Sequence, residues 1–521
     1  MMSWENHRTH SAPFKVARND IVGRHFIATR DLHPGDVVLR EAPLVTGPPL
    51  VTDCLVCVAC YRVLQNDTTS FRYCPRCGWS VCSQKCADSD VHFPECQLTV
   101  SNCDGGKIDI DNLLQLHPVY HSLIILRCLL LKNSNPEAWD KLQKLESHCA
   151  KRRATGHYEK DRKTVARFLL SHFDLERDFT EEDVLRLCGV VQVNNYLVRL
   201  TEPYYLAVYD VASFIEHNCV PNCAKVFTAN GELIIKIATP VSKDEHLSIC
   251  YTDPSYGTRP RRAKLLEELL ACRCQRCCDP TEMQSYFSAL RCINRDCAGY
   301  VLPEYPILED DNNNSDTQED IWLCSSCDAR VPGNDIMRVL DSVTQAAGQL
   351  DKTDLRACER FIANKSAAVH SNHYLLLPAR LALVGRSPSG LSDKELSEIH
   401  SELSQLLELS SCILPGENRI RGMLLYQFSL ALMELELRRV RCAEISLEEF
   451  RDNLEEPKKL LQKAVDVLQD QPEIVPEGQM GRLAKERLQS FDSLLEKLSS
   501  DATVEHSLKS KSPLKVATLA N

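Results

Sequence analysis

The clustering of cysteine is the feature that most constrains how this chain can fold. The sequence contains 26 Cys, and 23 of them lie between Cys54 and Cys327. Several form Cys-x2-Cys pairs, which place two sulfurs on one turn in the geometry that tetrahedral Zn²⁺ requires. The first ten residues, MMSWENHRTH, include no apolar segment of the kind that directs secretion, so we expect an intracellular protein. In a reducing compartment such pairs bind metal more often than they form disulfides, and the sequence predicts zinc.

Length, composition and charge narrow the class of protein. At 521 residues, with 44% hydrophobic and 26% charged residues, the chain should form about three or four globular units. Its 61 Lys and Arg against 72 Asp and Glu give a net charge of −11, which argues against a protein whose main task is to coat nucleic-acid phosphates. The most apolar run, residues 123–131, is short and interrupted by Arg127, so we expect no membrane partner.

Residues 54–96 hold eight Cys and one His, and the segment is too short to bury a core without metal. Zinc takes four thiolate or imidazole ligands, so eight ligands make two sites. The spacing resembles a MYND zinc finger, in which the ligand pairs interleave along the chain. This resemblance assigns one ion to Cys57, Cys60, Cys82 and Cys86, and the other to Cys74, Cys77, His92 and Cys96. Cys54 also pairs with Cys57 in spacing, but Cys57-Val-Ala-Cys60 matches the start of the finger better.

Apolar periodicity divides the first half of the chain into strand-rich and helical parts. Residues 14–50 alternate short β-branched runs with turn signals and predict strands, whereas residues 104–190 carry apolar residues at helical spacing. Residues 190–252 predict strands again, with a hairpin at Ala229-Asn230-Gly231.

From about residue 335 to 500 the pattern is helical throughout. Ser392 and Glu395 predict a capping box, and Pro472, Pro476 and Gly478 interrupt the pattern before a last helix. The regular leucines of this region indicate a packed helical domain rather than a ligand site.

Three further motifs identify a family. Residues 213–223 read SFIEHNCVPNC and residues 244–251 read DEHLSICY. They resemble the Asn-His-Ser-Cys-x-Pro-Asn and Gly-Glu-Glu-Leu-x-Ile-x-Tyr motifs of the SET and MYND domain family of protein-lysine methyltransferases. Residues 23–35 resemble the family's opening motif, in which a Gly-x-Gly loop precedes ATRDL-x-PG. The order of parts agrees along most of the chain, so the resemblance implies a protein-lysine N-methyltransferase that uses S-adenosylmethionine.

The resemblance also implies the fold. It is α+β, with a split, β-rich SET core that contains an inserted MYND zinc finger and a helical insert, followed by a zinc-binding post-SET region and an α-helical C-terminal domain. The expected boundaries are 1–53 for the first part of the SET core, 54–96 for the finger, 97–183 for the helical insert, 184–255 for the second part of the core, 256–333 for the post-SET and additional zinc-binding region, 334–502 for the helical domain, and 503–521 for a disordered tail.

The cysteines after the SET core predict two more zinc sites. Cys272-x-Cys274-x2-Cys277 supplies three thiolates, and in the family the cysteine of the Asn-His motif, here Cys219, supplies the fourth. Such an ion would tie the post-SET segment to the loop that forms the cofactor pocket. Residues 278–282 and 289–292 resemble the arthropod-type subgroup, which carries additional cysteines. The last candidate set, for which free thiols are the alternative, is Cys292, Cys297, Cys324 and Cys327. We therefore expect four zinc ions per chain.

The resemblance assigns the reacting groups. Methyl transfer requires in-line alignment of a deprotonated amine with a methyl group on a sulfonium, so positioning and electrostatics do most of the work. Tyr251 would place its hydroxyl beside the transferred methyl group, and Tyr196 is a candidate wall of the lysine channel; the alternative for Tyr251 is an ordinary core tyrosine. The residues expected to bind S-adenosylmethionine are Gly23, Arg24, Asn195, Glu216, His217 and Tyr251.

Three places depart from the family pattern. His25 replaces the second glycine of the opening loop, Glu216 replaces the asparagine of the Asn-His motif, and Leu269-Leu270-Ala271 replaces the usual aromatic residues before Cys272. A histidine restricts the backbone, and a glutamate adds a negative charge and removes an amide donor. The second hypothesis is therefore a catalytically weak or inactive SET-MYND scaffold that recruits partners as a transcriptional co-regulator.

The expected partners are proteins. They are a substrate lysine on a histone or another protein and, by resemblance, proline-containing peptides at the finger, in transcriptional regulation in the nucleus and cytoplasm. Residues 309–320 include six acidic residues and predict a solvated loop, with attraction of a basic peptide as the alternative. Direct binding of nucleic acid is disfavoured because the chain is acidic and the finger spacing differs from that of DNA-reading ββα fingers.

Overall fold

The computed structural model describes residues 12–50, 54–64, 72–304, 321–416 and 418–500. The predicted acidic loop at 309–320 and the predicted tail at 503–521 lie outside the described residues.

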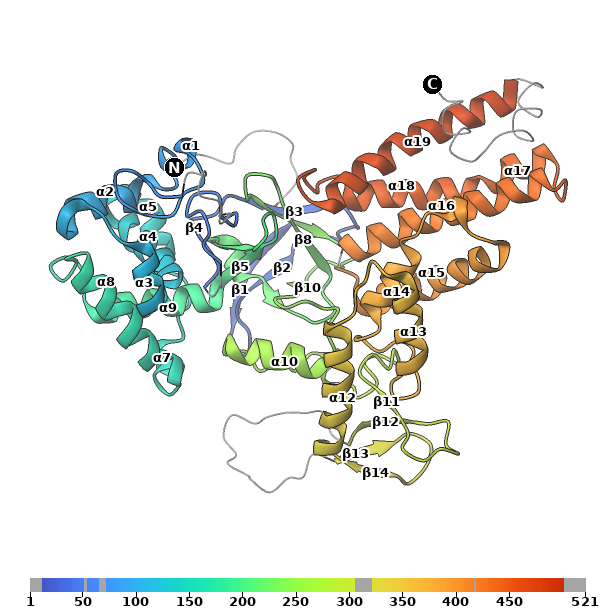
Figure 1. Ribbon diagram of the computed structural model, residues 1–521, viewed down its shortest axis with the longest axis horizontal. Coiled ribbons are helices and arrows are strands. Elements are labelled where there is room, and N and C mark those ends of the chain that lie inside the picture. Colours follow the sequence, from blue (N-terminus) through green and yellow to red (C-terminus); the bar gives the residue numbers. More distant parts are fainter. Residues whose placement is uncertain (1–11, 51–53, 65–71, 305–320, 417, 501–521) are drawn as a thin grey trace.

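Two separate segments of the chain build the strand-rich centre of the molecule (Figure 1). The first contributes β1 (Phe14–Asn19), β2 (Gly23–Ala28), β3 (Val37–Glu41) and β4 (Val45–Gly47). The second contributes β5 (Asn195–Val198), β6 (Tyr205–Val208), β7 (Glu216–His217), β8 (Cys223–Phe227), β9 (Leu233–Ile237) and β10 (His246–Ile249). These strands form three sheets, ordered β1-β2-β10-β7, β3-β9-β8 and β4-β6-β5. Every sheet joins strands from both segments, so the predicted split core is observed.

The register of these strands follows from local sequence. β8 and β9 pair antiparallel with Phe227 opposite Leu233, which confirms the predicted hairpin. Gly231 in its turn has φ of 78°, and a Cβ there would lie 2.5 Å from the hydroxyl oxygen of Tyr205, so only glycine fits. All pairings in the three sheets are antiparallel except that of β7 with β10.

The finger and the helical insert share one hydrophobic core. The finger contains α1 (Gln84–Ala87) and the start of α2 (Phe93–Asn102). The insert contains the short turn η1 (Asp104–Gly106), α3 (Ile110–Leu116), α4 (Val119–Ser134), α5 (Pro136–Gln143), α6 (Cys149–Arg153), α7 (Gly156–Asp161), the π-helical turn η2 (Arg162–Ala166), α8 (Arg167–His172) and α9 (Glu181–Asn194). The expected boundaries after residues 96 and 183 fall inside α2 and α9, which continue from one unit into the next.

The apolar helix α4 lies at the centre of that core. Buried residues of the finger, such as Trp79, and of α4, such as Leu123, belong to one cluster. Within the described residues no single helix is long and apolar enough to cross a membrane; α3 and α4, bent by 104°, pass that test only as a pair.

The chain then leaves the core through the cysteine-rich region and ends in helices. The core also contains the short helix η3 (Val211–Phe214). The cysteine-rich region comprises α10 (Thr258–Glu267), α11 (Gln275–Cys278) and the sheet of β11 (Leu290–Arg291), β12 (Tyr300–Pro303), β13 (Ile321–Cys324) and β14 (Arg330–Pro332). The helical domain comprises α12 (Gly333–Gly348), α13 (Leu355–Lys365), α14 (Leu377–Val384), η4 (Pro388–Gly390), α15 (Asp393–Ile413), α16 (Asn418–Arg441), α17 (Leu447–Asn453), α18 (Glu455–Leu468) and α19 (Pro476–Ser500).

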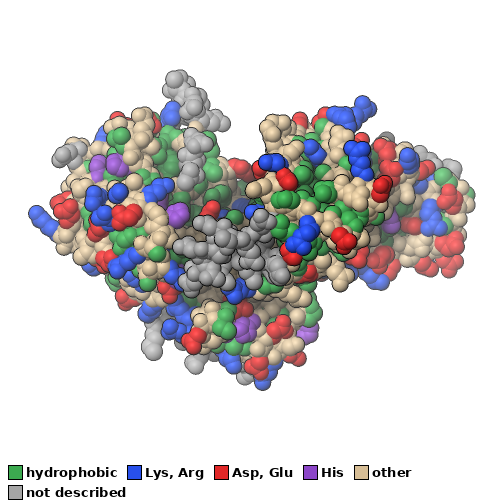
Figure 2. Space-filling model, turned by 90° about the horizontal axis from the view of Figure 1, so that it is seen from below, with side chains coloured by type: hydrophobic (Ala, Val, Ile, Leu, Met, Phe, Trp, Pro, Cys, Tyr) green, Lys and Arg blue, Asp and Glu red, His purple; other side chains and the backbone are tan. Residues whose placement is uncertain are grey.

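The helix signals of the C-terminal domain are mostly confirmed. The Ser392 side chain accepts from the Glu395 N–H, and the Glu395 carboxylate accepts from the Ser392 N–H, so the predicted capping box begins α15. One prediction is wrong in detail: Pro476 and Gly478 lie in the first turn of α19 rather than before it. A proline suits this place because the first N–H groups of a helix have no intrahelical partner. Figure 2 shows charged side chains of both signs spread over the visible face.

Candidate metal centres and active-site cavity

The sixteen predicted metal ligands lie in four groups of four. Within each group all the ligand atoms lie within 4.8 Å of one another, and the grouping is the one that the sequence predicts. The groups are Cys57, Cys60, Cys82 and Cys86; Cys74, Cys77, His92 and Cys96; Cys219, Cys272, Cys274 and Cys277; and Cys292, Cys297, Cys324 and Cys327.

The spacing of these atoms fits zinc. A tetrahedral ion with Zn–S bonds of about 2.3 Å holds its sulfurs about 3.8 Å apart. Sγ–Sγ distances are 3.5 Å for Cys60 and Cys82, 3.9 Å for Cys219 and Cys272, and 3.6 Å for Cys297 and Cys324. In the first group, the hydrogen bond from Cys60 lowers the pKa of Cys57 to about 5, so a thiolate is available near neutral pH. Four ligands without an open position are typical of structural zinc.

The imidazole ligand of the finger is held by a buried ion pair. His92 Nδ1 lies 3.0 Å from Glu95 Oε1, and its Nε2 lies 3.4 Å from Cys77 Sγ. Glu95 is paired in turn with Arg127 of α4, and all three side chains are buried. A carboxylate behind a histidine ligand orients the ring and raises its basicity. In the sequence, Arg127 is visible only as an interruption of an apolar run, and a charge inside such a run signals a buried partner.

Arg127 also joins the finger to the SET core. Its Nη2 donates to the Val58 carbonyl at 2.9 Å, and its Nη1 donates to the Thr46 carbonyl and the Tyr61 hydroxyl, both at 3.0 Å. Val58 and Tyr61 belong to the finger and Thr46 to β4, so one side chain connects three parts of the fold.

A second histidine connects the Cys219 group to Tyr251. His217 Nδ1 accepts a hydrogen bond from the Tyr251 backbone N–H at 3.0 Å, which leaves the proton on Nε2. That Nε2 lies 3.2 Å from Cys219 Sγ and can donate to the thiolate. The metal group and the backbone of Tyr251 are therefore held by one imidazole.

Buried charges anchor this metal group to the rest of the chain. Arg261 Nη2 lies 3.9 Å from Cys277 Sγ, and both Arg261 and Arg276 pair with Glu282, at 3.0 and 2.8 Å. Burial alone would raise the pKa of Glu282, but the two guanidinium groups outweigh it and hold the pKa at about 2. Arg276 also donates to the carbonyl of Ile413 at 3.2 Å, so the post-SET segment is bonded to the end of α15.

A fifth cluster in the helical insert is built differently. Ligand atoms of His121, Asp161 and Cys188 lie within 4.8 Å of one another. The Asp161 carboxylate is already paired with the buried Arg152, and burial lowers the pKa of His121 and raises that of Cys188. Neutral groups around an existing ion pair are typical of a structural polar cluster.

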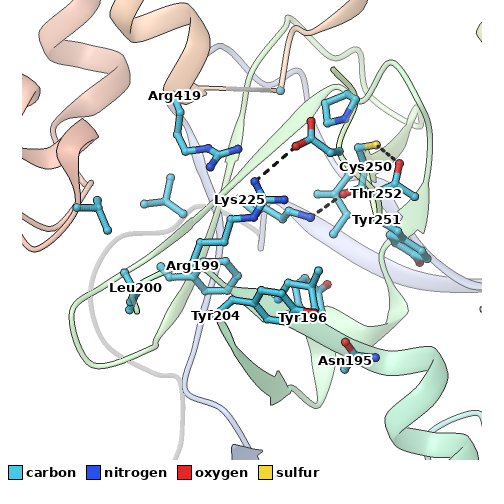
Figure 3. A pocket seen from close by; sticks show the side chains of 18 of the residues that line it. Asn195, Tyr196, Arg199, Leu200, Tyr204, Lys225, Cys250, Tyr251, Thr252 and Arg419 are labelled. Carbon is cyan, nitrogen blue, oxygen red and sulfur yellow. Dashed lines mark hydrogen bonds and ion pairs between the residues drawn. The ribbon is translucent and has the colours of Figure 1, made fainter. Parts of the chain in front are cut away.

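A large cavity opens between the SET core and the helical domain (Figure 3). Its volume is about 1210 Å³, and its lining includes Tyr196 and Tyr251 from the core and Arg419 and Val475 from the helical domain. Asn195, Lys225 and Glu268 line it as well. The cavity therefore contains both tyrosines that the sequence predicts for the reaction.

The two tyrosine hydroxyls are fixed on one short segment. Tyr196 Oη donates to the Ala212 carbonyl at 2.8 Å, and Tyr251 Oη donates to the Ile215 carbonyl. Burial raises the pKa of both side chains above the usual value, so both hydroxyls keep their protons near neutral pH.

Glu41 holds that segment, and sequence reasoning missed it. The Glu41 carboxylate accepts hydrogen bonds from the backbone N–H groups of Asp210, Val211 and Ala212, at 3.0, 2.9 and 2.8 Å. These are the N–H groups of the N-cap residue Asp210 and of the first two residues of η3, where a carboxylate is favoured. Glu41 is the last residue of β3 and lies far from η3 along the chain. No local sequence pattern therefore reveals this role.

The residues predicted to bind the cofactor come from separate elements, and one of them, Arg24, packs against η3. Gly23 has φ of 72°, and a Cβ there would meet nothing within 4 Å, so its surface is open. The Arg24 guanidinium lies 4.0 Å from the centre of the Phe214 ring and donates to the Lys144 carbonyl at 2.8 Å. Asn195 begins β5 and donates through Nδ2 to the Val191 carbonyl at 2.8 Å.

Two of the family departures contact one another through a third residue. The His25 ring is buried and stacks on the ring of His246 with centroids 4.4 Å apart. His246 Nδ1 lies 3.0 Å from Glu216 Oε2. His246 stands where the family motif has a second glutamate, so three altered positions form one contact across β2, β10 and β7. The His25 ring is thus packed inside the fold. Glu216 and His217 lie side by side on β7.

The sequence is similar to those of known SET-domain proteins. The SET domain family matches residues 23–252. SET domain-containing protein SmydA-8, isoform B, of Drosophila melanogaster is 26% identical over 399 residues, covering 73% of this chain and 81% of the relative. A SET and MYND domain-containing protein of Dictyostelium discoideum is 21% identical, over 46% of this chain and 77% of its own length. Histone-lysine N-methyltransferase ASHR1 of Arabidopsis thaliana is 22% identical over 58% of this chain and 62% of the relative.

Proposed function

Since residues 23–252 match the SET domain family and SET and MYND proteins are among the relatives, we propose that the chain transfers methyl groups from S-adenosylmethionine to the side-chain nitrogen of protein lysines. The name of the Arabidopsis relative, a histone-lysine N-methyltransferase, supports the reaction class. The observation that carries the proposal is the fixed pair Tyr196 and Tyr251 in a cavity large enough for an extended side chain.

Different residues of the chain would bind the cofactor and the acceptor lysine. S-adenosylmethionine, when bound, supplies the methyl group on a sulfonium, and the open surface at Gly23 together with Arg24, Asn195, Glu216 and His217 would hold it. The cavity would admit the acceptor lysine and exclude water from its nitrogen. Neutral tyrosine hydroxyls, fixed by backbone carbonyls, would orient that nitrogen without repelling it.

The acceptor amine must lose a proton before it can react, and Glu268 is suited to take it. Burial raises the pKa of Glu268 to about 7, and its carboxyl lines the same cavity. A group with this pKa exchanges protons readily near neutral pH.

Transfer of a labelled methyl group tests the proposal. The full chain is incubated with methyl-labelled S-adenosylmethionine and a protein extract, and incorporation into lysine is measured by mass spectrometry. We expect incorporation by the wild-type chain and its loss in Tyr251→Phe, which keeps the ring but removes the fixed hydroxyl. Wild-type incorporation no greater than that of Tyr251→Phe would overturn the proposal.

One observation favours the second candidate, a silent scaffold. Glu216 stands in place of an amide donor, and its carboxylate is engaged by His246. Calorimetry with S-adenosylmethionine separates the candidates, because a micromolar dissociation constant corresponds to about −8 kcal/mol and needs an intact pocket. Absence of binding heat would favour the scaffold.

The proposal also covers the substrates, the binding partners and the cellular location of the protein. We propose histones or other nuclear proteins as substrates, proline-containing peptides as ligands of the finger, and transcriptional regulation in the nucleus and cytoplasm. The acidity of the chain supports attraction of basic protein segments rather than nucleic acid. Capture of proline-containing peptides by the wild-type chain, compared with a variant of an exposed finger residue such as Phe93→Ser, tests the role of the finger.

A further inference from the structure

The cavity already contains a lysine that belongs to the chain. Lys225 lies in the middle of β8, between the buried residues Ala224 and Val226, and its side chain lines the cavity. Its Nζ donates a hydrogen bond to the carbonyl oxygen of Cys250 at 2.7 Å. The same nitrogen lies 6.0 Å from the centre of the Tyr196 ring. Figure 3 shows the side chain pointing toward the segment that carries Cys250 and Tyr251.

These contacts are the ones that a substrate ammonium would need. An aromatic face and a backbone carbonyl are groups that stabilise a cation in a half-buried site. Glu268, the carboxyl of the same cavity, interacts electrostatically with both Lys225 and Tyr251. Arg199 also lines the cavity, but it is paired with Asp253 at 3.5 Å. Lys225 therefore brings a cation to the part of the cavity beside the reaction tyrosines.

We propose that the Lys225 ammonium occupies the position of the acceptor lysine and so determines the acceptor specificity of the cavity. This inference rests on the proposed function. A free lysine is protonated near neutral pH, since its pKa is about 10.4. Two ammonium groups a few ångströms apart repel strongly where water is partly excluded. The cavity as folded therefore prefers a linear side chain without charge, and a lysine acceptor must displace Lys225.

Binding of two small probes to the full chain tests this preference without any methyl transfer. The probes are Nα-acetyl-lysine methylamide and Nα-acetyl-norleucine methylamide, which differ in the terminal ammonium, and binding is followed by ligand-observed NMR. We expect the wild-type chain to bind the norleucine probe roughly tenfold more tightly than the lysine probe. Lys225→Met should remove or reverse that preference, and Lys225→Arg should keep it.

Two further variants make the result decisive. Lys225→Gln is a second neutral variant that retains a donor for the Cys250 carbonyl, in case Lys225→Met fails to fold. Lys458→Met removes a partly exposed ammonium that pairs with Asp492 at 2.7 Å and does not line the cavity, so it should leave the wild-type preference unchanged. A preference that persists in both neutral Lys225 variants would overturn the proposal, as would equal binding of the two probes by wild type or no binding of either probe.

Calorimetry with S-adenosylmethionine distinguishes this inference from the proposed function. If the probes show the expected preference and no cofactor binds, the proposed function fails, and what stands is that Lys225 makes the cavity prefer an uncharged side chain. If the cofactor binds and methyl transfer to lysine peptides is the same in wild type and Lys225→Met, the role of Lys225 fails and the proposed function stands. We expect a severalfold increase in transfer in Lys225→Met.

Discussion

At the scale of single residues, Arg127 is the clearest case of one side chain that connects separate parts of the fold. Its guanidinium pairs with Glu95, which orients the metal ligand His92, and it donates to carbonyls in the finger and in β4. A buried ion pair is not by itself evidence of high stability, but removing one partner leaves an uncompensated charge in the core.

We therefore expect Arg127→Met to destabilise the protein by about 3–5 kcal/mol, because it strands the Glu95 carboxylate among apolar side chains. Urea unfolding followed by circular dichroism measures the change. The matched control is Arg153→Met, which removes an exposed pair with Glu182 and should change the free energy of unfolding by less than about 1 kcal/mol. Equal effects of the two substitutions would contradict the role of Arg127.

His373 gives a pH-dependent prediction. Burial lowers the pKa of His373 to about 3, so the ring stays neutral in the fold while the unfolded chain takes up a proton near pH 6.5. The contribution of the neutral His373 ring to the free energy of unfolding is therefore fully present above pH 6.5. It is lost as the pH falls toward 3, at about 1.4 kcal/mol per pH unit. We expect His373→Asn to reduce the loss of stability between about pH 7.5 and 5.5 by about 1.4 kcal/mol in urea unfolding. If the free energy of unfolding depends on pH in the same way in the wild type and in His373→Asn, the prediction for His373 is wrong.

At the scale of elements, the departures from the family motif belong to one interaction among strands. His25 on β2, His246 on β10 and Glu216 on β7 are adjacent because β10 lies between the other two strands. The β7–β10 pairing places Ser248 beside Glu216, which brings the Glu216 carboxylate to His246 two residues earlier. The altered residues therefore depend on one another.

A double-mutant cycle measures that dependence. Glu216→Asn and His246→Ala, singly and together, should show a coupling free energy of about 0.5–3 kcal/mol in unfolding, since the two side chains are in direct contact. As a control, the exposed pair Arg30 and Asp36, whose charged atoms are 3.5 Å apart, should show a smaller coupling. Additive effects of Glu216→Asn and His246→Ala would mean that Glu216 and His246 act independently.

At the scale of the whole molecule, one of the four metal groups joins two units of the fold, and the other three each lie within one unit. The Cys219 group joins the SET core to the post-SET segment, and Arg276 continues that connection to α15. All four ligands of the Cys74 group are buried, whereas all four of the Cys292 group are only partly buried. The four sites should therefore differ in how readily they lose metal.

We expect four zinc ions per chain by elemental analysis and stepwise loss to a chelator. The Cys292 group should release its ion first, with little change in helical circular dichroism, and the Cys74 group last, together with unfolding of the finger. Cys292→Ser should lower the content by one ion and remove the first step. A content of two ions or fewer would contradict the assignment of the post-SET sites.

The accuracy of the sequence predictions differs between local and distant features. The Cys-x2-Cys pairs, the capping box at Ser392 and the hairpin at Gly231 depend on residues a few positions apart, and each was predictable from spacing. The grouping of the zinc ligands into sets of four, including Cys219 with cysteines more than 50 positions away, came from the family resemblance. The pairing of Arg127 with Glu95, and of Glu41 with η3, joins residues 32 and about 170 positions apart. No periodicity in the sequence indicates such contacts.

The sequence by itself determined which residues can bind metal and where helices and hairpins begin, because these depend on residue type and short spacing, and its motifs singled out Tyr196 and Tyr251 by family resemblance. Only the tertiary structure decided what surrounds those tyrosines. It placed Lys225 in their cavity and joined His25, His246 and Glu216, because strand register and the packing of the helical domain against the core select the side chains that meet. Those choices depend on contacts formed across the whole chain.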